Sequence, residues 1–108
     1  MSKAEREKGK RGELDAAKEL RRVFPDAARK VVNHAGAEDG VDLVGTGALR
    51  VQVKNHQRYT PVTTLDTIKA TDGIPIVLTR AFRREWRIAM RLEDFLKILE
   101  DVGAAYEL

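Results

Sequence analysis

Apolar residues recur with helical spacing near the start of the chain and again near its end. Within residues 3–24 this stripe comprises Leu14, Ala16, Ala17, Leu20, Val23 and Phe24. Spacings of three and four residues predict an amphipathic helix over 3–24, which Pro25 ends. A second stripe, which predicts a helix over 93–102, comprises Leu92, Phe95, Leu96, Leu99 and Val102.

Between these two stripes the pattern changes to alternation and to short apolar runs. Apolar and polar side chains alternate along residues 49–54, which predicts a strand with one polar face. The run IPIVLT at 74–79 is typical of a central strand. A turn around Gly45-Thr46-Gly47 predicts a hairpin with the strand before it. The other predicted strands span 28–33, 41–45 and 86–91.

The elements follow one another in the order α-β-β-β-α-β-β-α once a short helix over 63–70 is included. This order indicates a mixed α/β fold. A chain of 108 residues forms one domain, so we assign residues 1–108 to a single unit. We expect residues 1–8 and 103–108 to fray at its two ends.

Composition excludes several classes of protein and of site. The chain has no cysteine, which excludes a disulfide-stapled scaffold, a thiol nucleophile and a cysteine zinc site. Two histidines argue against a multi-histidine metal site. We find neither a signal peptide nor an apolar run of about 20 residues, so we expect a cytoplasmic protein without a membrane partner.

Charged residues are distributed unevenly, although the net charge is only +3. Residues 1–33 carry 10 basic and 6 acidic side chains, and residues 80–91 carry five arginines and one glutamate. Residues 34–48 carry three acidic side chains and neither Lys nor Arg. Basic blocks suit a polyanionic partner, and an acidic segment between them suits a divalent cation. The alternative is ordinary solvated charge.

Three polar features occupy positions that a core or a sheet would give to apolar residues. Glu13 shares the face of the first stripe, so it needs a partner, a metal or a route to solvent. Asp42 lies within the run VDLV, although aspartate is disfavoured in strands outside edges and turns. Gln52 and Lys54 share one face of the strand over 49–54, which is a solvated hairpin face or one side of a site. The hairpin would bring Asp42 close to that pair.

Joined in this order, the features resemble the PD-(D/E)XK nuclease superfamily, and within it the archaeal-type Holliday-junction resolvases, a branch also found in viruses. The matching segments are Lys8-Gly9-Lys10-Arg11-Gly12-Glu13-Leu14, Gly40-Val41-Asp42-Leu43 and Val51-Gln52-Val53-Lys54. The resemblance covers residues 8–100. It implies a restriction-endonuclease-like core, in which helices flank a central mixed β-sheet.

The chain departs from the family pattern at two positions. Val41 stands where the family often has proline, which only shapes the start of the strand. Gln52 stands where the family usually has an acidic residue, and an amide oxygen binds a hard cation more weakly than a carboxylate does. Some restriction-type branches also use glutamine here. Weaker metal binding, or a DNA-binding protein without activity, are the open alternatives.

The resemblance implies a Mg²⁺-dependent endonuclease that resolves four-way DNA junctions, with Mn²⁺ as a substitute. The implied catalytic residues, called the four motif residues below, are Glu13, Asp42, Gln52 and Lys54. Asp42, Gln52 and the Val53 carbonyl would hold the metal, and Glu13 would hold it directly or through water. Lys54 would orient the attacking water and stabilise developing charge. Two symmetric cuts imply a homodimer, for which Phe95, Leu99 and the Trp86 strand are candidate interface elements and equally candidate core.

Further polar residues are predicted to hold the DNA backbone, with a solvated surface as the alternative. They are Lys8, Lys10, Arg11, His34, Arg58, Tyr59, Thr60, Arg80, Arg83 and Arg84. Three other functions stay open: a restriction-, nicking- or repair-type endonuclease of the same fold acting on duplex DNA, a non-catalytic nucleic-acid-binding module, and an RNA-processing partner.

Overall fold

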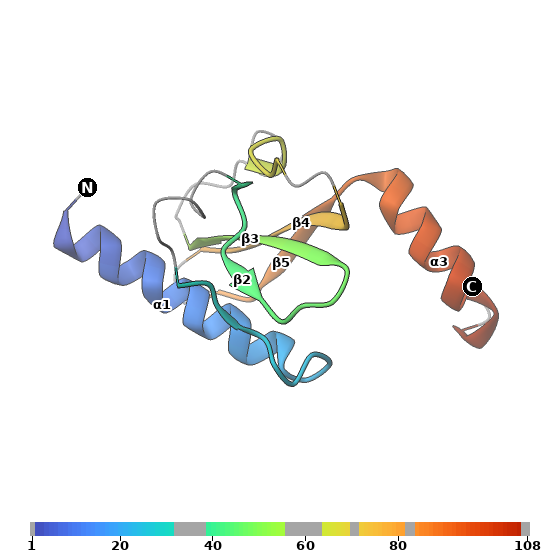
Figure 1. The fold of residues 1–108 in the computed structure, drawn as a ribbon, viewed down its shortest axis with the longest axis horizontal. Helices are drawn as coiled ribbons and strands as arrows, with labels where there is room; N and C mark the ends of the chain where they lie inside the picture. The colour runs from blue at the N-terminus through green and yellow to red at the C-terminus, as the bar shows by residue number, and fades with distance from the viewer. Residues whose placement is uncertain (1, 32–38, 56–63, 70–71, 82–83, 107–108) are drawn as a thin grey trace.

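The chain folds as a mixed α/β unit in which one long helix lies against a small mixed sheet (Figure 1). The structure, a computed structural model, describes residues 2–31, 39–55, 64–69, 72–81 and 84–106. Its elements are α1 (Lys3–Leu20), β1 (Ala28–Arg29), β2 (Leu43–Val44), β3 (Leu49–Asn55), β4 (Ile74–Arg80), β5 (Arg87–Met90) and α3 (Leu92–Tyr106). At the place of the helix predicted over 63–70, residues 64–65 are helical and residues 66–67 form a turn.

The larger sheet has the strand order β3-β4-β5. β3 and β4 are parallel, with Asn55 opposite Arg80 at the end of the register. β5 returns antiparallel to β4. β1 and β2 form a separate two-stranded antiparallel sheet. The prediction of a mixed sheet is thus confirmed in a smaller form than expected, with the strands divided between two sheets.

The hairpin predicted between residues 41–45 and 49–54 does not form, because β2 and β3 are not paired as strands. β2 pairs with β1, and the segment before β2 reaches β3 through one backbone hydrogen bond, from the Asp42 N–H to the Val51 carbonyl (2.8 Å). The turn between β2 and β3 bends sharply at Gly45, which has a φ of 74°. The two strands nevertheless lie side by side, so Asp42 stays next to β3.

The α1 helix packs on β3 through its smallest side chains. The core contains Ala16 and Ala17 of α1 against Leu43, Val51, Val53, Ile76 and Leu78. Gly12 is also buried, and it packs closely against β3. A Cβ at this position would lie 2.7 Å from the Cβ of Asn55. Leu14, which the apolar stripe predicted to be buried, is 44% exposed. The helix presents small residues to the sheet, so its buried face is rotated from the one expected.

Helix and strand ends differ from the predictions for identifiable reasons. The Ser2 hydroxyl accepts a hydrogen bond from the Glu5 N–H (3.1 Å) and caps α1, which ends at Leu20 rather than at residue 24. A turn occupies residues 21–23, ahead of Pro25, because the residue before a proline is disfavoured in the helical region. β1 comprises only Ala28 and Arg29 of the predicted 28–33. The alternating burial predicted for β3 is confirmed.

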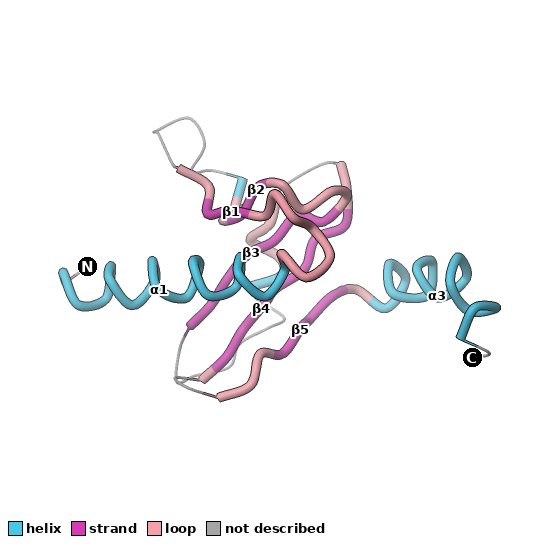
Figure 2. Tube along the Cα trace, turned by 90° about the horizontal axis from the view of Figure 1, so that it is seen from below, coloured by secondary structure: helices cyan, strands magenta, loops and turns pink. Residues whose placement is uncertain are grey.

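The final helix projects away from the rest of the molecule. In both views α3 lies beyond the end of β5, far from α1 (Figures 1 and 2). It is longer than the predicted 93–102. Its apolar stripe is open to solvent: Leu92 is 69% exposed and Phe95 is 44% exposed. In the described part of the chain, no helix is long and apolar enough to cross a membrane.

Candidate active site

Asp42 is fixed between the two sheets by its own backbone and side chain. Its N–H donates to the Val51 carbonyl, and its carbonyl accepts from the Lys30 N–H, both at 2.8 Å. Its Oδ2 accepts a hydrogen bond from the Val53 N–H (2.8 Å). The carboxyl group is therefore held against β3 beside Gln52. This explains how an aspartate can lie within an apolar run: its side chain replaces a missing strand partner.

Burial raises the pKa of Asp42 from its ordinary value of 3.8 to about 6. The hydrogen bond from Val53 acts in the opposite direction and lowers this pKa. The negative charge of Glu13 raises it further, while Lys54 and Arg29 lower it. A carboxyl group with a raised pKa, close to a second carboxylate, is typical of a site that binds a cation or handles protons.

Glu13 projects from α1 toward the same place and has a cationic partner. The Nε of Arg29 donates to Glu13 Oε1 at 2.6 Å, and the Glu13 side chain is only 20% exposed. Glu13 needs a partner, a metal or a route to solvent, and the structure supplies Arg29 as its partner. Arg29 was not among the predicted site residues. A half-buried carboxylate signals a nearby cation, but identifying that cation requires knowing that β1 packs against α1.

Gln52 carries an unsatisfied oxygen. Among the residues that the structure describes, its Oε1 is the one buried side-chain polar atom without a hydrogen-bond partner. A buried acceptor left unpaired costs about 1–3 kcal/mol, so such an atom in a folded protein calls for an explanation. A bound cation, or a donor on a ligand, would satisfy it.

A cavity of about 590 Å³ joins these groups. It is lined by α1, β1, the Asp42 segment and β3, and it contains all four motif residues together with Val53 and Arg29. The predicted DNA contacts Lys8 and Lys10 also line it. Lys54 makes no ion pair within the described segments. Three segments that are far apart in the sequence therefore meet at one cavity, which has basic residues at its rim.

The other predicted DNA contacts are not part of this cavity. Arg11 is exposed on α1 and does not line it. Arg80 is engaged inside the protein with Asp15 and Asn55, and Arg84 is exposed after β4. The remaining predicted contacts lie outside the described residues: His34, Arg58, Tyr59, Thr60 and Arg83. Roles in DNA binding stay predictions for all of these residues.

The donor set of the cavity fits a hard divalent cation. Carboxylate, amide and main-chain oxygens are the ligands that Mg²⁺ accepts. Val53 lines the cavity, and because its N–H donates to Asp42, its carbonyl leaves the strand on the same edge. Across the described part of the chain, no group of three His, Cys, Asp or Glu side chains could hold a metal. The unpaired Gln52 oxygen is a further oxygen donor that a cation could use.

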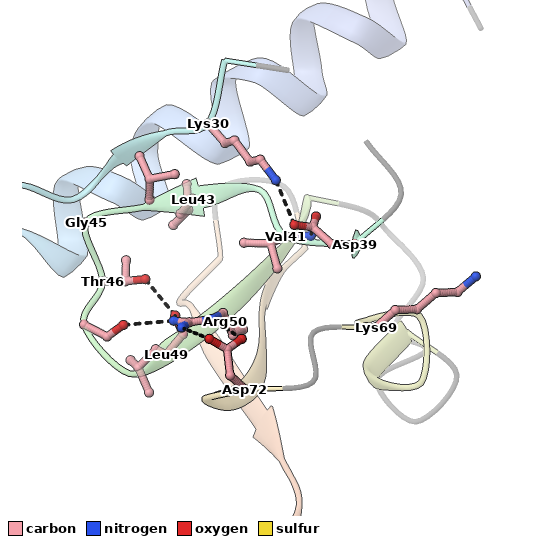
Figure 3. A pocket seen from close by; sticks show the side chains of 12 residues that line it. Lys30, Asp39, Val41, Leu43, Gly45, Thr46, Leu49, Arg50, Lys69 and Asp72 are labelled. Atoms are coloured by element: carbon pink, nitrogen blue, oxygen red, sulfur yellow. Dashed lines mark hydrogen bonds and ion pairs between the residues drawn. The ribbon is translucent and has the colours of Figure 1, made fainter. Parts of the chain in front are cut away.

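A second cavity of about 590 Å³ is lined by β2 and by the turn that follows it (Figure 3). Its charges are paired within the protein: Lys30 with Asp39 at 2.8 Å, and Arg50 with Asp72 at 3.0 Å. Lys69 also lines it, outside these two pairs (Figure 3). None of the four motif residues lines this cavity. The chemistry suggested by the sequence therefore belongs to the first cavity.

Comparison of the chain with protein-family models, with curated proteins and with solved structures found no match. The resemblance to the nuclease superfamily therefore stays a prediction from the three motif segments.

Proposed function

We propose that this chain is a Mg²⁺-dependent endonuclease that hydrolyses phosphodiester bonds in DNA, with the four-way junction as its substrate. The observation that carries the proposal is the convergence of the four motif residues on one cavity. Two carboxylates, an unpaired amide oxygen and a lysine suit phosphodiester hydrolysis better than any other chemistry of the described residues. The basic residues on the rim suit a polyanionic substrate.

Within this proposal, the metal would be held by Asp42, by Gln52 Oε1 and by the Val53 carbonyl. Glu13 would reach it directly or through water. When bound, Mg²⁺ lowers the pKa of a coordinated water and neutralises charge on the phosphate. The protein supplies the ligand oxygens and holds Asp42 in place through the Val53 N–H.

The cationic side chains have separate tasks in the proposed mechanism. Lys54 Nζ orients the attacking water and stabilises the charge that develops on the phosphate. Arg29 is anchored on Glu13 through its Nε, which leaves the rest of its guanidinium for a phosphate oxygen. Lys8 and Lys10 hold the neighbouring backbone, where contacts fix position rather than sequence.

The proposal is tested by incubating the protein with labelled DNA with and without Mg²⁺. We expect cleavage only with the metal. Asp42→Asn should abolish cleavage and retain DNA binding, because it removes a ligand charge and leaves the basic rim intact. A wild-type protein that binds DNA but never cuts it, in either Mg²⁺ or Mn²⁺, would contradict the nuclease assignment.

One observation favours a second candidate function. Only two of the four motif residues, Glu13 and Asp42, are acidic where the family pattern implies three, because Gln52 replaces one. A DNA-binding module that has lost catalysis would have such a site. The same assay separates the two functions, since only the nuclease releases cut strands.

A resolvase makes two symmetric cuts, so the proposal includes a homodimer. The surface proposed for pairing is the open apolar face of α3 together with Ile88, which is 56% exposed on β5. Exposed charges of both signs lie beside this face: α3 carries Glu93 and Glu100, and it is flanked by Arg87 and Arg91, which form exposed ion pairs with Glu85 and Asp66 in the same chain. A two-fold axis would set the acidic helix of one copy against the basic strand of the other.

A further inference from the structure

Asn55 lines the same cavity next to the proposed catalytic lysine, and both ends of its amide are hydrogen-bonded within the protein. It is the last residue of β3 and is 6% exposed. Its Nδ2 donates to the Lys8 carbonyl of α1 (3.3 Å), and its Oδ1 accepts from Arg80 Nε (3.2 Å). The residue therefore connects the helix that carries Glu13 to the ends of two strands.

Arg80 extends this connection to a second point on α1. Its Nη2 contacts Asp15 Oδ2 at 2.6 Å, and its guanidinium lies 4.4 Å from the centre of the Trp86 ring. The Arg80 side chain is only 15% exposed. A guanidinium buried to this degree needs these partners.

These contacts lie before and after Glu13 along α1. The Lys8 carbonyl lies just over one turn before Glu13, and Asp15 lies two residues after it. Gly12, the residue next to Glu13, packs directly on Asn55 and has no room for a Cβ. The rest of the α1 face is Ala16 and Ala17, whose apolar contacts have no direction. The hydrogen bonds of Asn55 and Arg80 are directional and fix where the helix sits along β3.

We propose that Asn55 and Arg80 are positioning residues that set where α1 presents Glu13 to Asp42 and Gln52, and that they thereby control the metal affinity of the site. The metal part of this inference rests on the proposed function. Partners of ligands that do not touch the metal themselves commonly change metal affinity or activity by about 10- to 100-fold when mutated. Displacements near 1 Å have effects of about the same size on catalysis.

The first test measures Mn²⁺ binding to the whole chain from the electron paramagnetic resonance signal of the free ion. We expect Asn55→Ala to weaken binding by about 10-fold or more. Arg80→Lys keeps a charge for Asp15 but loses the fork that also reaches Asn55, so a smaller weakening is expected. In cleavage assays, the Mg²⁺ concentration for half-maximal rate should rise more than the saturated rate falls.

Val77→Ala is the control for a general loss of stability. Val77 is 1% exposed on β4 and belongs to neither the cavity nor the α1 core. Its truncation should lower the stability of the fold and leave Mn²⁺ affinity unchanged. Equal weakening of Mn²⁺ binding by Val77→Ala and Asn55→Ala would overturn the positioning role.

A second test is independent of the metal. The chain has no cysteine, so Glu7→Cys on α1 and Ala48→Cys before β3 provide two unique sites for spin labels. Both side chains are exposed. Adding Asn55→Ala should shift or broaden the distance distribution between the labels. An unchanged distribution with unchanged Mn²⁺ affinity overturns the inference alone, whereas a wild type that binds no Mn²⁺ overturns the proposed function and the metal part together.

Discussion

Asp42 links the stability of the metal-free fold to pH. Its pKa is about 6 in the fold against 3.8 ordinarily, so the folded state holds this proton more tightly than the unfolded state. Its contribution to stability is therefore fully present below pH 3.8 and is lost as the pH rises from there through 6. Above this window the protein carries a buried charge that the unfolded chain would solvate.

Asp42→Asn should remove that dependence. With a chelator present, we expect the variant to be more stable than wild type at pH 8 by on the order of 1–2 kcal/mol and nearly equal at pH 4. The asparagine oxygen can still accept from the Val53 N–H. Urea unfolding at the two pH values measures this. A stability difference that is the same at both would show that Asp42 is not the group responsible.

Gln52 is the residue at which the site departs from an all-carboxylate donor set. Gln52→Glu should bind Mg²⁺ more tightly, because a carboxylate is a stronger ligand for a hard cation than an amide. We expect retained cleavage, a lower Mg²⁺ requirement and a changed preference between Mg²⁺ and Mn²⁺. Metal titrations of the cleavage rate test this. Complete loss of activity would instead indicate a specific contact by the neutral amide.

Among the elements, those governed by local pattern were the ones that the sequence predicted well. The alternation along β3 and the apolar run of β4 specify strands by themselves. The buried face of α1 was missed in part, because Gly12 and the alanines pack closely where a larger Leu14 was expected to lie. Whether β2 pairs with β1 or with β3 depends on how the elements pack together, and no local pattern carries that information.

The α3 helix has an apolar face that the described part of its own chain leaves open. Leu96 is 41% exposed on this face. If two copies pair through it, Leu96→Glu should convert a dimer into a monomer, whereas Lys97→Glu on the polar side should leave the dimer intact. Sedimentation equilibrium at micromolar concentration measures the mass of each. A wild-type protein that is monomeric under these conditions would contradict the proposed homodimer.

At the scale of the whole molecule, the sequence predicted which motif residues would come together but did not predict the residues that support them. The four motif residues were named from their types and spacing, and the fold brings them into one cavity. Arg29 and Asn55 were missed because their roles arise only from contacts between elements, with Glu13 in one case and with Arg80 in the other. Long-range pairing of this kind has no signature in a single sequence.

The basic rim of the cavity gives a prediction for DNA binding. Lys10 lines the cavity, whereas Lys18 lies in the last turn of the same helix and is exposed away from it. Lys10→Ala should weaken DNA binding uniformly across sequences and reduce the slope of log affinity against log salt by about 1. Lys18→Ala should leave the slope unchanged. Equal effects of the two substitutions would argue against a binding surface at this cavity.

The most direct test of the central claim compares the rate at which the wild-type protein cleaves a four-way junction with the rate for a linear duplex of matched sequence, in Mg²⁺. We expect symmetric cuts in the junction, little cutting of the duplex, and no cutting of either by Asp42→Asn. Equal cleavage of both substrates would contradict the junction specificity and favour a duplex endonuclease of the same fold. Absence of cleavage in Mg²⁺ and in Mn²⁺ would contradict the enzyme itself.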